Sequence, residues 1–131
     1  MTTNNLLLDT HTFLWWIQDS KELSAKSRKA ILNPAYTCYL SAASVWEMSV
    51  KASIGKLELT VPVEQLVSEH MSINGFKLLD ISFRHVARVQ NLPFYHRDPF
   101  DRLLIVQAQL ENMTIVSRDK SFKQYDVNRL W

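Results

Sequence analysis

The stretch Leu6-Leu7-Leu8-Asp9, close to the start of the chain, decides the fold class. Three consecutive apolar residues with no polar residue between them are typical of a strand that is buried on both faces, as in a parallel sheet. A helix-like segment follows directly at residues 10–18, with Phe13, Leu14 and Ile17 on one face. A buried strand that leads straight into a helix predicts a β-α-β unit, with Asp9 at the carboxyl edge of the sheet.

Strands and helices alternate along the rest of the chain. Further strands are expected at residues 37–40, 76–81 and 113–116, with a short fifth strand within 126–130, and residues 57–61 read as an extended, edge-like segment. Helices are expected to begin after Ser24, at Ser41 or Ser44, at Pro62, after Ser82 and after Asp98. This alternation predicts a three-layer α/β/α sandwich with a mainly parallel central sheet, formed by one domain over residues 1–131.

The composition limits the class of protein. The chain has 131 residues, of which 47% are hydrophobic and 21% charged, as in an ordinary globular domain. Its two glycines rule out a glycine-rich dinucleotide fingerprint, and its lone Cys38 has no partner for a disulfide. The net charge of +2 permits nucleic-acid binding without requiring it. Because no signal peptide or membrane-spanning run is evident, we expect a cytoplasmic protein without membrane contact.

Four acidic residues stand at ends of predicted strands or early in predicted helices: Asp9, Glu47, Asp101 and Asp119. The carboxyl ends of parallel strands meet at one edge, so the fold could bring these side chains into one crevice. Clustered carboxylates repel each other unless a cation neutralises them, and Mg²⁺ or Mn²⁺ prefers such oxygen ligands. This pattern favours metal-assisted cleavage of a phosphodiester. Zinc is disfavoured, because the histidines show no ligand spacing.

Each acid also has a structural interpretation. Asp9 and Asp119 could cap helices or turns, and Glu47 stands four residues before Lys51, at the spacing of a helical salt bridge. Asp98, directly before a proline, is well explained as a helix cap. Asp101 is less well explained, since that helix already has its cap. Capping alone does not readily explain all four acids.

The tryptophans suggest where a partner would bind. Trp15 and Trp16 are adjacent on the first helix, so both cannot enter one narrow core face, and we expect one to be partly exposed. Trp46 is expected in the core. An exposed aromatic patch on a globular domain usually marks an interface.

Four motifs carry the acids and are specific as a set: Leu7-Leu8-Asp9-Thr10-His11, Ser41-Ala42-Ala43-Ser44-Val45-Trp46-Glu47, His96-Arg97-Asp98-Pro99-Phe100-Asp101-Arg102-Leu103-Leu104 and Ile115-Val116-Ser117-Arg118-Asp119. Together they resemble the PIN-domain ribonucleases, in particular the VapC-like toxins of bacterial type II toxin–antitoxin systems, over nearly the whole chain. The resemblance implies an α/β/α sandwich that cleaves single-stranded RNA with Mg²⁺ or Mn²⁺. It also implies a homodimer and a small antitoxin whose C-terminal segment blocks the site.

The resemblance also assigns roles to residues. The acidic quartet of the family is matched by Asp9, Glu47, Asp101 and Asp119, with Asp98, Thr10 and Ser117 as supporting residues. Two alternatives stay open. The chain could be a non-catalytic PIN-like domain that binds RNA or protein and whose acids are structural, or it could be a metal-dependent DNA nuclease.

Overall fold

A five-stranded parallel sheet forms the centre of the molecule, a computed structural model that describes residues 4–131. The first three residues, which the expected domain includes, lie outside this range. The strands, in sheet order, are β3 (Lys77–Leu79), β2 (Thr37–Ser41), β1 (Asn5–Leu8), β4 (Thr114–Val116) and β5 (Asn128–Leu130). All neighbouring pairs are parallel, and Leu7 of β1 lies opposite Tyr39 on one side and Ile115 on the other. The predicted parallel α/β architecture is therefore confirmed.

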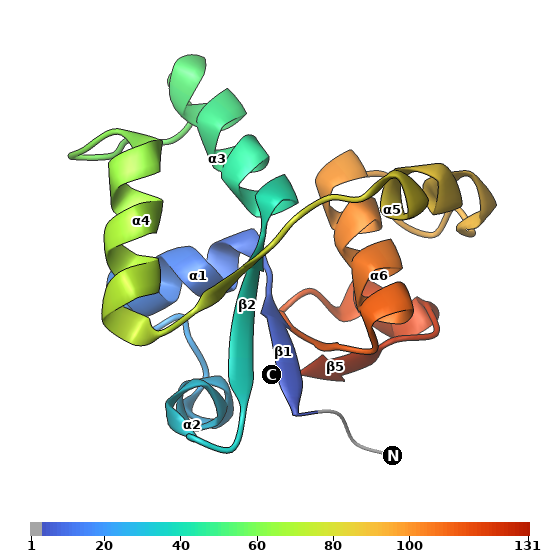
Figure 1. The fold of residues 1–131 in the computed structure, drawn as a ribbon, viewed down its shortest axis with the longest axis horizontal. Coiled ribbons are helices and arrows are strands. Elements are labelled where there is room, and N and C mark those ends of the chain that lie inside the picture. The colour runs from blue at the N-terminus through green and yellow to red at the C-terminus, as the bar shows by residue number, and fades with distance from the viewer. Residues whose placement is uncertain (1–3) are drawn as a thin grey trace.

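Helices cover both faces of this sheet. They are α1 (Thr10–Ile17), α2 (Ala25–Leu32), α3 (Ala42–Ser53), α4 (Val63–Asn74), α5 (Phe83–Arg88) and α6 (Pro99–Glu111). Figure 1 shows α1, α2 and α4 on one side of the strands, with α5 and α6 on the other. Two short 3₁₀ helices, Val89–Asn91 and Lys120–Gln124, complete the connections. Among the described residues, no helix is long and apolar enough to span a bilayer.

The apolar run of β1 separates two hydrophobic cores. Leu6 and Leu8 point into the core that α1, α2 and α4 form, whereas Leu7 points into the core under α6. All three leucines are almost completely buried. Successive side chains of a strand point to opposite faces, so a strand covered by helices on both sides must be apolar at every position. The uninterrupted run that predicted a parallel sheet has this structural reason.

Helix α3 stands at the carboxyl edge of the sheet and contributes to both cores. Ala43 packs into the core under α6, and Met48 packs into the opposite core. The face that points inward also carries Ser44 and Glu47, so Trp46 is turned to the outside and is 54% exposed. The expectation that Trp46 lies in the core was wrong, because the buried stripe of this amphipathic helix passes on either side of it.

The segment at residues 57–61, which read as extended and edge-like, does not join the sheet, because β3 occupies that edge and pairs with β2 alone. Helix α4 begins at Val63, with Pro62 as its N-cap.

The two tryptophans of α1 share the exposure that was expected of one: Trp15 and Trp16 are both half-buried. Trp16 donates its indole N–H to Asn74 Oδ1 at 3.0 Å.

Candidate active site

Four chain segments meet at the carboxyl edge of the sheet, and each brings one of the predicted acids. Asp9 follows β1 directly and caps α1, accepting a hydrogen bond from the Thr12 backbone N–H at 2.8 Å. Ser41 ends β2 and caps α3, whose second turn carries Glu47 on its inward face. Asp119 lies just after β4, and Asp101 lies in the first turn of α6. The helix caps therefore fix where the carboxylates lie.

Asp9 and Glu47 form the buried part of this cluster, with 6% and 4% of their surfaces exposed. Glu47 accepts hydrogen bonds from the Thr10 hydroxyl at 2.7 Å and from Lys51 Nζ at 2.5 Å. The salt bridge expected from the spacing of Glu47 and Lys51 is thus present. Burial raises the pKa of Asp9 despite hydrogen bonds from Ser117 and Thr12 that act in the opposite direction.

Asp101 shows that the acids have converged. Burial and then the negative charges of Asp98, Asp9, Glu47 and Asp119, in that order, together raise the pKa of its carboxyl to about 8. Carboxylates influence one another in this way only when they are close together. Asp98 also caps α6, as predicted, accepting from the Asp101 backbone N–H at 3.0 Å.

His96 joins the two more exposed acids and was not identified from the sequence. Its Nε2 lies 3.1 Å from Asp101 Oδ2 and 3.0 Å from Asp119 Oδ2. Its Nδ1 accepts a hydrogen bond from the Asp98 backbone N–H at 3.1 Å, so the neutral ring carries its proton on Nε2. The imidazole therefore donates its Nε2–H toward both carboxylates and holds their oxygens together.

The environment of Asp119 differs from that of the other acids. Burial acts to raise its pKa, but hydrogen bonds from Ser121 and His96 outweigh it, and the pKa is lowered overall. The Ser117 hydroxyl accepts the Asp119 backbone N–H at 3.0 Å and also bonds Asp9. Ser117 thus links the loop after β4 to the residue that follows β1.

The donor set fits a hard divalent cation. Ligand atoms of His96, Asp101 and Asp119 lie within 4.8 Å of one another. Because the Nε2 of His96 carries a proton, the free lone pairs facing the centre belong to carboxylate oxygens. Burial raises the pKa of Asp101, and the negative charges of the neighbouring acids raise it further in the same direction. Oxygen ligands with surplus negative charge are the donors that Mg²⁺ or Mn²⁺ takes.

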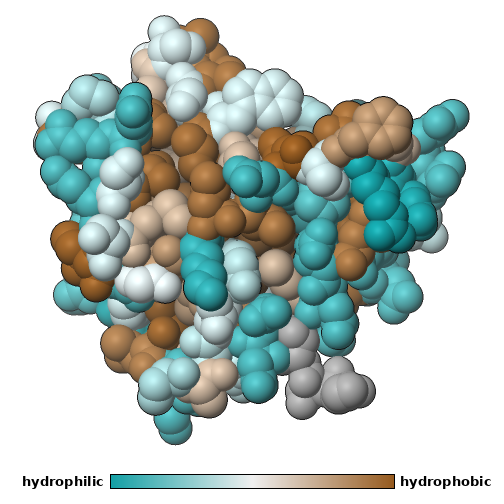
Figure 2. Space-filling model, viewed as in Figure 1, coloured by the Kyte–Doolittle hydropathy of each residue, from teal (hydrophilic) through white to brown (hydrophobic). Residues whose placement is uncertain are grey.

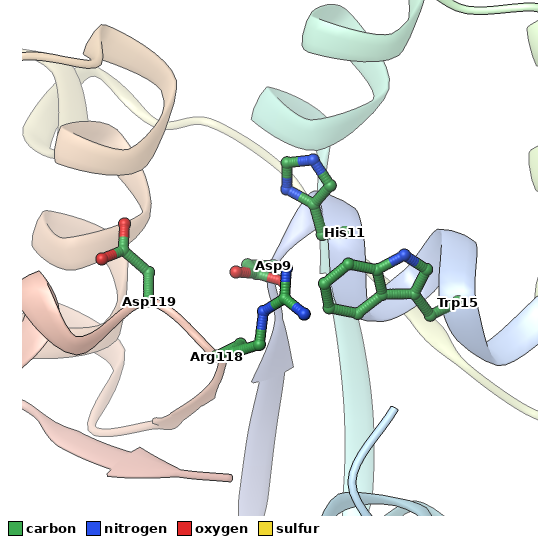
Figure 3. Close-up of a pocket in the computed structure, with 5 residues that line it drawn as sticks. All are labelled: Asp9, His11, Trp15, Arg118 and Asp119. Carbon is green, nitrogen blue, oxygen red and sulfur yellow. The ribbon is translucent and has the colours of Figure 1, made fainter. Parts of the chain in front are cut away.

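A pocket of about 320 Å³ opens beside the acids. Its lining residues are Asp9, His11, Trp15, Arg118 and Asp119. Figure 3 shows His11 and Trp15 of α1 on one side, Asp119 on the other, and Asp9 with Arg118 between them. The acidic edge is therefore continuous with an aromatic and basic surface.

Comparison with known proteins identifies the family. The chain belongs to the PIN domain family, whose model matches residues 6–128. It is similar to Ribonuclease VapC22 of Mycobacterium tuberculosis, with 28% identity over 128 residues that cover 95% of this chain and 93% of that protein. The family resemblance found in the four sequence motifs is thus confirmed.

Solved structures share the fold at low sequence identity. A structure of VapBC2 from Rickettsia felis bound to promoter DNA matches with a TM-score of 0.72 and 17% identity, covering 97% of this chain and 98% of that one. DNA-bound VapBC from Salmonella typhimurium matches with a TM-score of 0.66 and 16% identity, covering 99% and 98%. These similarities confirm the arrangement of helices and strands that places the acids at one edge.

Proposed function

We propose that this protein is a divalent-metal-dependent endoribonuclease that cleaves single-stranded RNA, and that it is the toxin of a VapBC-type pair. One observation carries the proposal: Asp9, Glu47, Asp101 and Asp119 come from four chain segments to one edge of the sheet, where burial and then the negative charges of Asp98 and the other three acids raise the pKa of Asp101 to about 8. Membership of the PIN domain family and similarity to a protein named a ribonuclease support the same conclusion.

The residues of the site have two roles: carboxylates would bind the cation, and neighbouring polar groups orient those carboxylates. Asp9, Glu47, Asp101 and Asp119 would hold Mg²⁺ or Mn²⁺, which when bound polarises a phosphate and lowers the pKa of a water. Thr10, Lys51, Ser117 and His96 fix these carboxylates by the hydrogen bonds described above. Outer partners of this kind set the orientation and basicity of metal ligands. The protein's own contribution is therefore to preassemble acidic oxygens that the cation and the RNA phosphate then share.

The direct test is an RNA-cleavage assay with purified protein. Cleavage of single-stranded RNA should require Mg²⁺ or Mn²⁺ and should stop on addition of EDTA. Undiminished cleavage in EDTA would contradict the metal mechanism. Competition among RNA, single-stranded DNA and small phosphodiesters separates a ribonuclease from a DNA nuclease. RNA binding without turnover would favour the non-catalytic alternative.

An exposed apolar stripe on α3 supports the proposal of protein partners. Trp46, Val50 and Ile54 recur at every fourth residue and are all exposed. Figure 2 shows apolar surface on the face seen in Figure 1, including the free end of α3. Such a stripe on a surface helix usually marks an interface. Several similar solved structures are toxin–antitoxin complexes, which supports a small antitoxin as one partner. A second copy of this chain is the other partner that we propose.

Sedimentation of the isolated chain tests the second copy. The wild type should sediment as a dimer at micromolar concentration, and Ile54→Lys should shift it to a monomer because a charge then enters the apolar contact. Ile73→Lys on α4, at a residue that is also exposed, is the matched control and should remain dimeric. A monomeric wild type would contradict the homodimer without affecting the nuclease assignment.

A further inference from the structure

The wall of the 320 Å³ pocket that faces away from Asp119 is built from aromatic and basic groups. The guanidinium of Arg118 lies over the Trp15 ring, 4.5 Å from its centroid. Trp15 is in turn supported by Trp131, at 5.8 Å between ring centroids, and by His11 at 5.5 Å. The Arg118 side chain is 56% exposed, and its Nη1 bonds Glu22 Oε2 at 2.5 Å. The guanidinium is thus held over the Trp15 ring, with surface still open to solvent.

The acidic wall of the pocket suits the phosphate of a nucleotide, through a bound cation, and the aromatic and basic wall suits its base. Asp9 and Asp119 line one part of the pocket and belong to the acids that would hold the cation and, through it, a phosphate. The rings of His11 and Trp15 and the plane of Arg118 line the rest. Aromatic rings and arginine planes are the surfaces on which unpaired RNA bases stack. The volume lies near the lower end of the range of about 300–1,000 Å³ for small-molecule sites.

We propose that this pocket binds a single nucleotide of the RNA strand next to the cleaved phosphodiester, with its base against His11 and Arg118. This inference rests on the proposed function, because it assumes that the RNA backbone reaches the acidic edge. Arg118 also supplies positive charge beside a cluster of carboxylates, which lowers the cost of bringing a polyanion to that edge. His11, Trp15 and Arg118 are therefore assigned to substrate binding.

The chain offers an internal control for this pocket. Arg28 lies over the neighbouring Trp16, 5.9 Å from the ring centroid, and bonds Asp19 Oδ1 at 2.7 Å. This second arginine–tryptophan pair faces a different pocket, whose lining includes none of the acidic quartet. If stacking on any surface arginine sufficed, both pairs would bind nucleotides equally. If closeness to the acids matters, only the pair of Arg118 and Trp15 will bind nucleotides.

The test is a titration with the four nucleoside 5′-monophosphates in the presence of Mg²⁺, followed by the indole N–H resonances of ¹⁵N-labelled protein. The Trp15 resonance, assigned with Trp15→Phe, should shift, and the Trp16 resonance should not. Arg118→Gln and His11→Ala should each weaken nucleotide binding by about tenfold, within the range for loss of one stacked base. Arg28→Gln should bind as the wild type does. With an RNA substrate, Arg118→Gln should raise KM with little change in kcat.

The experiments distinguish an error in the nucleotide-pocket inference from an error in the proposed ribonuclease function. The pocket inference is overturned if no nucleotide shifts the Trp15 resonance, if Arg28→Gln weakens binding as much as Arg118→Gln, or if the KM for RNA is unchanged in both Arg118→Gln and His11→Ala. RNA cleavage that persists alongside any of these results leaves the nuclease in place. Nucleotide binding at Trp15 in a protein that never cleaves RNA supports the pocket and overturns the nuclease.

Discussion

Asp9 and Glu47 differ from Asp101 and Asp119 in what surrounds them. The first two are almost fully buried, and threonine, serine and lysine groups donate hydrogen bonds to them. The second two are partly exposed and share the single Nε2–H of His96. Lys51 offsets the charge of Glu47, and Ser121 and His96 lower the pKa of Asp119, whereas burial raises the pKa of Asp9 and, together with neighbouring negative charges, that of Asp101. Loss of Asp101 and loss of Glu47 should therefore have opposite consequences for stability.

The largest expected effect is on catalysis. Asp101→Asn should lower the rate of RNA cleavage by more than the roughly 10–100-fold that loss of an outer partner costs, because it removes charge that holds the cation. Asp9→Asn should do the same while keeping a residue that can cap α1. Circular dichroism should show an intact fold in both. Near-native cleavage rates in both variants would mean that the acids serve only as caps.

The stability of the metal-free protein should respond in opposite senses to loss of Asp101 and to loss of Glu47. The unfolded chain releases the Asp101 proton near pH 4, and the folded chain releases it at about pH 8. Between these values the folded state holds an extra proton, so its stability falls as pH rises. Asp101→Asn removes this loss and should be more stable than wild type at pH 8 by ~1 kcal/mol or more, with the difference vanishing below about pH 4.

Urea unfolding in EDTA at several pH values measures this difference. Glu47→Gln is the matched comparison and should be less stable than wild type, because Lys51 loses its charged partner. Added Mg²⁺ should stabilise wild type more than Asp101→Asn. An identical pH dependence in wild type and Asp101→Asn would show that Asp101 is not surrounded by uncompensated charge.

A smaller effect is expected from the residue that holds the exposed acids together. His96→Ala removes the Nε2–H donor and should reduce Mn²⁺ or Mg²⁺ affinity by roughly 10–100-fold. His96→Gln replaces it with an amide N–H at a similar reach and should recover most of that loss. Calorimetric titration of the cation distinguishes the two variants. Equal losses in both would indicate that the ring nitrogen itself binds the metal.

The smallest effect should come from Asp98. Asp98→Asn can still cap α6 and should cleave RNA at close to the wild-type rate, whereas Asp98→Ala should be less stable than Asp98→Asn by ~1 kcal/mol. Both substitutions remove the same charge, so thermal unfolding of the pair isolates the cap. A loss of cleavage in Asp98→Asn as large as that in Asp101→Asn would instead place Asp98 on the cation.

The parts of the fold that depend on local sequence were predictable. The apolar run of β1 and the capping residues of α2, α5 and α6 fix those elements through contacts within a few residues. The extended, edge-like segment at residues 57–61 does not pair with the sheet, because a strand needs a neighbour with free hydrogen bonds, and no local pattern reveals which neighbours are free.

In the candidate site, too, the residues placed by local sequence were predictable and the contacts between distant segments were not. The acids could be placed because each stands at a strand end or in the early turns of a helix. The partnership of His96 with Asp119 joins residues in separate loops, and the stacking of Arg118 on Trp15 joins residues far apart in the chain. Residue spacing does not record such tertiary contacts. The one sequence signal for His96 is its place just before Asp98 in the motif that opens α6.

Contacts with β5 determine when, during synthesis, the loop that carries Asp119 is held in place. Arg129 of β5 donates hydrogen bonds to the backbone carbonyls of Arg118 and Asp119, at 2.9 and 3.1 Å. Trp131 packs on Trp15, at the edge of the same pocket. During synthesis the residues from 5 to 119 emerge first, and the loop that carries Asp119 gains its hydrogen bonds from Arg129 only when residues 128–131 follow. The contacts with β5 that hold this loop therefore form only after all four acids have emerged.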